Sequence, residues 1–234
     1  MIDIHCHILP GIDDGPADMT ESIRMARIAA ADGITTIVAT PHLKDRIDTS
    51  EIIAAGVDEL NRHLTDHKIP VRILRGADIN VMLTTPKFRD YTINGTQYLL
   101  FEFPHTHMPG NAGHIIFNAM KEGLHPIITH PERNPSVIRE PDIIIALRET
   151  GPLIQITAGS LMGHFGPESR ECAMYLLKKG AVDFIATDAH SYDNRPPILS
   201  EGLRVAEKIL GREHAYLLVE ANPLAIIEGR QIPA

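Results

Sequence analysis

The first 15 residues read MIDIHCHILPGIDDG, and the fold prediction starts from residues 1–15. Apolar and polar residues alternate from Ile2 to His7, which is the period of two expected of a β-strand. Side chains two positions apart share one face of a strand, so His5 and His7 should point the same way. With the carboxylate of Asp14 close behind, these two imidazoles make half a metal site.

A polar turn follows this strand at once. Pro10-Gly11 and Asp13-Asp14-Gly15 are turn sequences, so the histidines should lie at the C-terminal end of the strand. Taken alone, the stretch is equally compatible with an edge strand that carries histidines and ends in a polar turn. The rest of the chain favours the metal site, because the same pattern recurs along it.

The composition limits the class of protein. At 234 residues and 44% hydrophobic content, with no linker-like stretch, the chain predicts one α/β domain over residues 1–234. The net charge of −8 leaves no basic stripe for nucleic acid. Only two cysteines, Cys6 and Cys172, are present, which favours a reducing compartment. No apolar run approaches the ~18 residues of a membrane span, so we expect no membrane insertion and a cytoplasmic protein.

Strand-like and helix-like stretches alternate along the chain. Seven strands that alternate with helices are typical of parallel β/α winding, and we expect a single-domain, distorted (β/α)7 barrel of the TIM type. After the opening strand, the expected strands are 34–40, 71–78, 98–103, 126–130, 153–157 and 182–190, and the expected helices are 19–32, 52–67, 112–122, 141–150, 168–179, 199–210 and 212–219.

Metal-binding residue types fall at the ends of six of these seven strands, strand 153–157 being the exception. The C-terminal strand ends of a β/α barrel are where its chemistry is housed, so we expect the metal site there. The candidate ligands are His5, His7, Asp14, His42, Asp78, Glu102, His130, Asp188 and His190. Because one catalytic zinc takes three protein ligands plus water, this set predicts two or three metals with bridging carboxylates. Mixed imidazole and carboxylate ligands favour Mn, Fe or Zn over Ca or Mg.

Two arginines lie beside the candidate ligands. Arg133 is three residues after His130, and Arg195 is five after His190 and directly before two prolines that should stiffen its loop. A guanidinium group matches phosphate oxygens in a bidentate manner. A solvated surface position is the simpler interpretation of most arginines, but adjacency to strand-end ligands favours a catalytic role here. Metals plus arginines predict hydrolysis of phosphomonoesters.

Several motifs occur in one order along the chain: His5-Cys6-His7, Asp13-Asp14-Gly15, Thr40-Pro41-His42, Gly76-Ala77-Asp78-Ile79, Phe101-Glu102-Phe103, His130-Pro131-Glu132-Arg133, Asp188-Ala189-His190 and Asn194-Arg195-Pro196-Pro197. This series resembles the polymerase-and-histidinol-phosphatase (PHP) family, and more closely its bacterial protein-tyrosine phosphatases that regulate capsule and exopolysaccharide synthesis. The resemblance covers nearly the whole chain. It implies a trinuclear, often manganese-dependent site that dephosphorylates tyrosine-rich tails of bacterial tyrosine autokinases. That family usually has Glu, one methylene longer, in place of Asp78.

Other functions stay open at this point. One alternative is a small-molecule phosphatase of the same superfamily, such as histidinol-phosphatase. Another is a non-catalytic regulator that keeps the metal scaffold and binds a kinase. An exonuclease-like metal hydrolase is disfavoured by the acidic charge. The short strand-end loops predict an open mouth, where Phe165 or Tyr192 could contact the ring of a phosphotyrosine.

Further histidines and the cysteines carry weaker signals. Cysteine-dependent phosphatases need an arginine six residues after the nucleophile, which neither Cys6 nor Cys172 has, so a thiolate mechanism is disfavoured. The pair His63 and His67 is i, i+4 on an expected helix, where a solvated face is the simpler interpretation. The remaining candidates could serve as loop residues or pocket contacts, and they are His105, His107 and His164.

Overall fold

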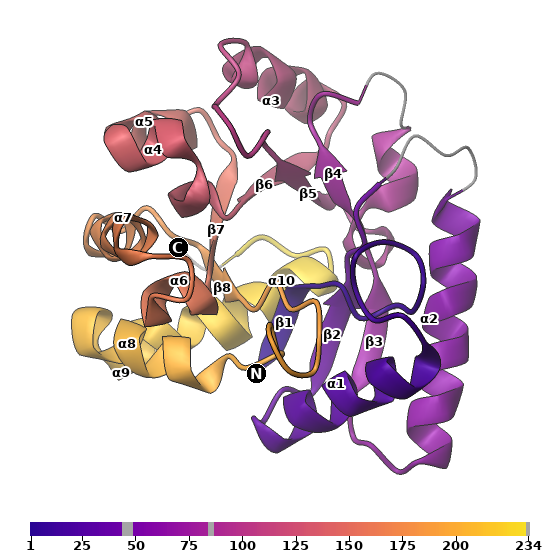
Figure 1. Ribbon diagram of the computed structural model, residues 1–234. Coiled ribbons are helices and arrows are strands. Elements are labelled where there is room, and N and C mark those ends of the chain that lie inside the picture. The colour runs from indigo at the N-terminus through magenta and orange to yellow at the C-terminus, as the bar shows by residue number, and fades with distance from the viewer. Residues whose placement is uncertain (44–48, 84–86, 233–234) are drawn as a thin grey trace.

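The computed structural model describes residues 1–43, 49–83 and 87–232 of the chain. Parallel strands lie at the centre and helices surround them, as the alternating sequence pattern predicts (Figure 1). The strands are β1 Ile2–Cys6, β2 Thr36–Ala39, β3 Arg72–Arg75, β4 Asp78–Asn80, β5 Tyr98–Glu102, β6 His125–Thr129, β7 Leu153–Thr157 and β8 Phe184–Ala186.

The strands form two parallel sheets, with the orders β1-β2-β3 and β4-β5-β6-β7-β8. Two isolated bridges, between Cys6 and Ala189 and between His42 and Asp78, connect strand ends of one sheet to those of the other. In the described part of the chain the two sheets do not close into one continuous barrel. The α/β fold with parallel strands is therefore confirmed, whereas a closed (β/α)7 barrel is not.

The single strand expected over 71–78 is two strands in the structure. β3 ends at Arg75 and stays beside β2, whereas Asp78 begins β4 in the other sheet. The chain passes close to β2 in between, since a Cβ atom on Gly76 would lie only 2.8 Å from Val38 Cγ1. Asp78 is thus the first residue of a short strand and not the last residue of a longer one.

The helices are α1 Met19–Ala31, α2 Thr49–Asp66, α3 Ala112–Lys121, α4 Pro135–Arg139, α5 Asp142–Arg148, α6 Ala158–Met162, α7 Pro167–Lys178, α8 Ser200–Leu210, α9 Arg212–Tyr216 and α10 Asn222–Ile227. The seven expected helices are present within a few residues, but helix 212–219 ends at Tyr216 and continues as the π-helical turn Leu217–Ala221. The sequence patterns missed α4, α6 and α10. α4 and α6 have five residues each, too few for a helical period to be recognised.

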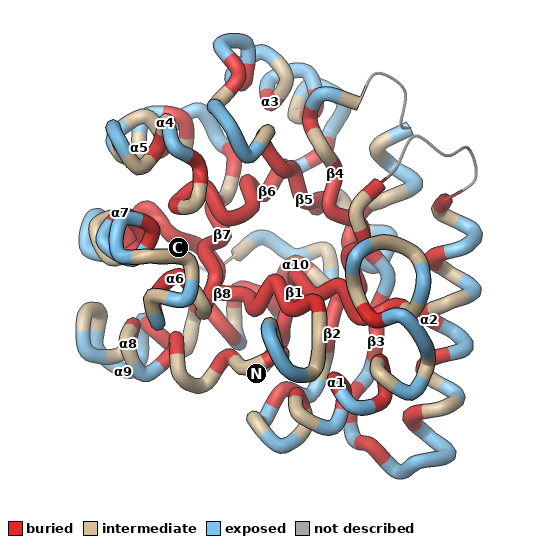
Figure 2. Tube along the Cα trace, viewed as in Figure 1, coloured by how far each residue is buried: buried red, intermediate tan, exposed pale blue. Residues whose placement is uncertain are grey.

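The core consists of two groups of apolar side chains, and the buried strands run through its centre (Figure 2). One group is made largely by strand residues that pack on each other, such as Ile4, Leu100 and Phe184, together with Ile226 of α10. The other group lies between the strands and the surrounding helices. None of the helices in the described ranges is long and apolar enough to cross a membrane.

Candidate metal centre

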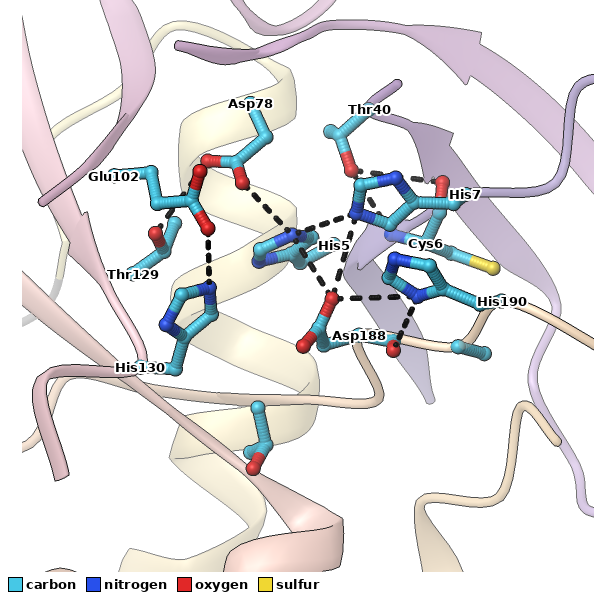
Figure 3. A network of polar contacts seen from close by, with 12 residues as sticks. His5, Cys6, His7, Thr40, Asp78, Glu102, Thr129, His130, Asp188 and His190 are labelled. Atoms are coloured by element: carbon cyan, nitrogen blue, oxygen red, sulfur yellow. Dashed lines mark hydrogen bonds and ion pairs between the residues drawn. The ribbon is translucent and has the colours of Figure 1, made fainter. Parts of the chain in front are cut away.

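All nine candidate ligands of the sequence analysis come together at the ends of the strands. Figure 3 shows seven of them, without His42 and Asp14. They form four overlapping groups whose ligand atoms lie within 4.8 Å of one another: His7, Asp14, His42 and His190; His5, His130 and Asp188; His5, His7 and Asp78; and His42, Asp78 and Glu102. Several residues belong to two groups. This sharing is the arrangement expected of a centre with more than one metal ion.

A β-bulge in β1 places His5. The ladder pairs Asp3 with Ile37 and Cys6 with Ala39, so β1 has one more residue than β2 between these pairs. Bulges redirect side chains and are frequent beside active sites. The Nδ1 atom of His5 is 2.9 Å from Gln155 Oε1 in β7, which leaves its Nε2 atom facing the other ligands.

Asp13 holds His7 in the same way. Its Oδ2 atom lies 2.6 Å from His7 Nδ1 and also accepts a 2.9 Å hydrogen bond from the backbone of His42. Burial by itself would raise the pKa of Asp13, but the hydrogen bond and charge of His7 lower it to about 2. Asp13 therefore stays ionised and fixes both the ring of His7 and the turn that carries His42.

His130 and Asp188 adopt positive φ angles of 33° and 52°, in the left-handed region that non-glycine residues rarely occupy. Such backbone conformations cluster at functional sites, where the surrounding structure maintains them. His130 follows β6 directly, and its Nε2 atom lies 3.4 Å from Glu102 Oε1. The turn before Asp188 is fixed by Asp3, which accepts hydrogen bonds from the backbone and hydroxyl of Thr187 at 3.0 and 2.5 Å.

Asp188 lies at the middle of the centre. Its Oδ1 atom is 3.4 Å from the Nε2 atoms of both His5 and His7, and 3.6 Å from His190 Nδ1. Burial would raise the pKa of this carboxyl, but the neighbouring histidines hold it well below its usual range. Burial would likewise lower the pKa of His7, yet hydrogen bonds to Asp13 and Asp188 raise it to about 10.

The donor set fits divalent transition metals. Asp78 Oδ2 and Glu102 Oε1 are buried and have no hydrogen-bond partner in the described structure. An orphaned buried carboxylate oxygen is costly unless a cation reaches it. Asp78 Oδ2 lies 3.6 Å from His5 Nε2 and 3.4 Å from His42 Nδ1, so this shorter acid reaches two ligand groups despite its missing methylene.

The two predicted arginines meet on the same carboxylate. Arg195 Nη2 donates to Asp188 Oδ2 at 2.6 Å, and Arg133 Nη1 forms a hydrogen bond and ion pair with the same oxygen. Both guanidinium groups lie over the ring of Phe165, with Cζ to ring-centroid distances of 4.2 Å for Arg133 and 5.5 Å for Arg195. With side chains 17% and 32% exposed, neither is a freely solvated surface arginine.

The sequence does not predict three residues that position the ligands and arginines, namely Gln155, Asp13 and Glu132. Gln155 corrects the expectation that strand 153–157 contributes nothing, and its signal was a lone amide inside an apolar strand. Asp13 is part of the motif Asp13-Asp14-Gly15, from which the sequence predicts a ligand role for Asp14 alone. Glu132 is fully buried, and its Oε1 atom accepts hydrogen bonds from Thr157 and Ser160, which fixes the turn before Arg133 against α6.

The weaker candidates are mostly peripheral. His105 Nε2 lies 3.3 Å from Glu102 Oε1, but its side chain is 65% exposed at the edge of the centre. The ring of His107 contacts Thr106 Oγ1, and His107 belongs to no ligand group in the described part of the chain. The same is true of His63 and His67. Cys6 is fully buried, and this burial raises the pKa of its thiol well above the usual value, which disfavours a thiolate nucleophile.

Residues 1–228 match the family model of capsular polysaccharide synthesis, CpsB/CapC. The chain belongs to the CpsB/CapC family. The tyrosine-protein phosphatase YwqE of Bacillus subtilis is 39% identical over 232 residues, which are 97% of this chain and 91% of that protein. The tyrosine-protein phosphatase CpsB of Streptococcus agalactiae serotype III is 28% identical, over 99% of this chain and the whole of its own length.

A solved structure agrees with this CpsB/CapC membership. It comes from work on YwqE of Bacillus subtilis and CpsB of Streptococcus pneumoniae, described as metal-dependent tyrosine phosphatases. The TM-score is 0.93 at 36% sequence identity, and the match covers 100% of this chain and 96% of that one. The resemblance noted from the sequence motifs is thereby confirmed.

Proposed function

We propose that this chain is a metal-dependent protein-tyrosine phosphatase. Its substrate would be the phosphorylated, tyrosine-rich tail of a bacterial tyrosine autokinase that acts in capsule or exopolysaccharide synthesis. The observation that carries the proposal is the convergence of Arg133 and Arg195 on Asp188, beside nine metal-binding side chains. Family membership supports the same conclusion, since YwqE and CpsB bear the name tyrosine-protein phosphatase.

The proposed centre holds two or three divalent transition metals, with manganese preferred and iron or zinc as alternatives. The proposed ligands are His5, His7, Asp14, His42, Asp78, Glu102, His130, Asp188 and His190. Bound metals of this kind activate water and neutralise charge on a phosphoryl group. Mixed imidazole and carboxylate donors suit manganese, iron and zinc better than calcium or magnesium.

The arginines would bind the phosphoryl oxygens. Phe165 supports both guanidinium groups from one side, and Asp188 holds them at the edge of the centre. Charge-assisted N–H donors that are fixed in advance stabilise the negative charge of a phosphoryl transition state. Gln155 and Asp13 would orient His5 and His7, each through its Nδ1 atom. In this proposal residues 1–234 act as a single domain in the cytoplasm.

A steady-state comparison in the presence of manganese tests the proposal. We expect kcat/KM for a tyrosine-phosphorylated peptide to exceed that for histidinol phosphate by at least ~100-fold, about 2.7 kcal/mol of differential transition-state binding. A phosphoserine peptide should also be a poorer substrate than phosphotyrosine. A preference for histidinol phosphate would support the small-molecule phosphatase instead, and no turnover of any phosphomonoester by metal-loaded protein would support the non-catalytic regulator.

A further inference from the structure

A pocket of about 250 Å³ lies next to the two arginines. Its walls come from α6, from the turn that follows α6 and from the loop before α8, and the residues that matter here are Ala158, Gly159, Met162, Phe165, Arg195 and Ile198. Ligand pockets for drug-sized molecules are typically ~300–1,000 Å³, so this one is sized for a single side chain.

The pocket adjoins the candidate metal centre through Arg195. Arg195 lines it and at the same time donates two hydrogen bonds to Asp188, through Nη2, at 2.8 and 2.6 Å. Thr187, which also lines the pocket, is the residue directly before Asp188. A phosphate bound by Arg195 would therefore have the pocket on one side and the metal-binding side chains on the other.

The wall nearest the arginines is aromatic. The ring of Phe165 is covered by the guanidinium groups of Arg133 and Arg195. α6 approaches the ring so closely that a Cβ atom on Gly159 would lie 2.9 Å from Phe165 Cε2, which restricts where the ring can move. Tyr192, the other aromatic residue expected near a substrate ring, instead lies below Arg24, whose Cζ is 5.0 Å from the ring centroid.

The remaining wall is apolar but accessible. Met162 of α6 is 37% exposed, and Ile198 in the loop before α8 is half-buried. Thioether and aromatic groups both make favourable contacts with aromatic rings. The polar lining residues His164 and Asn194 are exposed, so they are able to keep their hydrogen bonds with water when an apolar group enters.

We propose that this pocket binds the aromatic ring of the substrate's phosphotyrosine while Arg133 and Arg195 bind its phosphate. The inference rests on the proposed function and adds to it the source of tyrosine specificity. A phosphoserine side chain carries its phosphate on one methylene and has no group to fill the pocket. The sequence predicts an open mouth with Phe165 or Tyr192 against the ring, whereas the adjoining pocket gives the ring a defined place beside Phe165.

Two phosphonates separate ring binding from phosphate binding. Benzylphosphonate and ethylphosphonate both offer a phosphonate to the arginines, but only the first offers a ring. Calorimetric titration of the manganese-loaded protein measures both affinities without any turnover. We expect benzylphosphonate to bind the unaltered protein about 10-fold more tightly or better, because its ring buries apolar area.

The variants Met162→Ala and Met162→Ala/Ile198→Ala test the walls. We expect benzylphosphonate affinity to fall, by about 10-fold in the double variant, while ethylphosphonate affinity stays within about 2-fold. The matched control is Leu224→Ala in α10, since Leu224 is 38% exposed against 37% for Met162 and does not line the pocket. The control should change neither affinity.

A variant that fills the pocket with a larger side chain gives a second test, in case the alanine variants destabilise the pocket wall. Ile198→Phe should occupy the pocket and abolish the preference for benzylphosphonate without loss of ethylphosphonate binding. Equal losses for both phosphonates, or no loss for either, would overturn the inference. Phosphotyrosine turnover by the unaltered protein is measured separately. Absence of this turnover would count against the proposed function. A preference for benzylphosphonate that stays unchanged in the variants would count against the pocket alone.

Discussion

The Nε2 atoms of His5 and His7 face each other at a distance of 3.2 Å, while their Nδ1 atoms are held by Gln155 and Asp13. Oxygen acceptors at both Nδ1 positions favour the tautomer with its proton on Nδ1. His7 has a raised pKa and keeps a proton on Nε2 in the metal-free protein, but a bound metal ion would displace that proton, and both Nε2 lone pairs would then point at the ion. Asp188 Oδ1 lies 3.4 Å from each Nε2 atom, so the space between them is surrounded by electron donors and suited to a cation.

This relationship predicts the metal content and its effect on stability. Protein purified without chelators should carry two to three transition-metal ions per chain by elemental analysis. Chelation should abolish phosphatase activity and lower the melting temperature, because the buried oxygens of Asp78 and Glu102, which have no hydrogen-bond partner in the described structure, lose the cation that offsets their burial. Manganese should restore both. Full activity with fewer than one ion per chain would contradict a multinuclear centre.

Removal of either arginine should weaken catalysis without loss of metal. Arg133→Ala and Arg195→Ala each delete a charge-assisted donor, and we expect a loss of about 2–4 kcal/mol in transition-state binding, or about 30- to 1,000-fold in kcat/KM. The measurement is steady-state kinetics with elemental analysis of the same samples. Metal loss or unfolding in either variant would make that arginine structural.

Arg148 offers a matched control for these variants. It also pairs with a buried carboxylate, since its Nη2 atom lies 2.7 Å from Asp183 Oδ1, but Asp183, unlike Asp188, belongs to no ligand group in the described structure. The hydrogen bond to Asp183 raises the pKa of Arg148. Arg148→Ala should therefore lower the melting temperature and leave kcat/KM nearly unchanged.

Alkylation of the folded protein should leave activity intact. Burial raises the pKa of Cys6 well above its usual value and that of Cys172 to about 12, with the charge of Glu132 adding to the latter. A raised pKa disfavours the thiolate, which is the form that reacts, so both thiols should react very slowly in the folded state. Iodoacetamide and mass spectrometry should find two modified cysteines only after unfolding. Inactivation of the folded protein by alkylation would point back to Cys6.

The ligands were predictable from sequence for a physical reason. Histidine and carboxylate side chains are rarely placed directly after apolar strands unless they have a task there, and parallel strands bring such residues to one edge. The division at Gly76-Ala77 was not predictable, because apolar residues continue on both sides of Gly76, and the crossing depends on the close approach of the chain to Val38. Pairing between β1 and residues near Ala189 is equally a matter of tertiary geometry.

Positioning residues were harder to find than ligands. Gln155 is a lone amide inside an apolar strand, but glutamine seldom binds these metals, so this signal does not indicate a role at a metal centre. The short helix α6 escaped for lack of a full period, and with it the wall of the pocket beside Phe165. Those features depend on which strands are neighbours in the sheet. The local pattern of a single sequence does not encode that arrangement.

Gln155 should control metal retention through His5. Gln155→Leu keeps a similar volume but removes the acceptor at 2.9 Å from His5 Nδ1, so the imidazole loses its fixed orientation and tautomer. Loss of such a partner typically lowers metal affinity by about 10- to 100-fold. Competition with a chromogenic chelator measures that affinity. Gln155→Glu retains an oxygen acceptor and should restore most of it.

Asn222 supplies the control, because it is a second buried amide with one hydrogen bond and one unpartnered atom, away from the ligands. Its Nδ2 atom donates to Asp183 O at 2.9 Å, and Oδ1 has no partner in the described structure, just as Gln155 Nε2 has none. Asn222→Leu should thus cost a similar amount of stability, about 1 kcal/mol for one hydrogen bond, without a change in metal affinity. Equal metal loss in the two leucine variants would mean that Gln155 acts through general stability, and retention in Gln155→Leu would mean that the ring of His5 is held by packing alone.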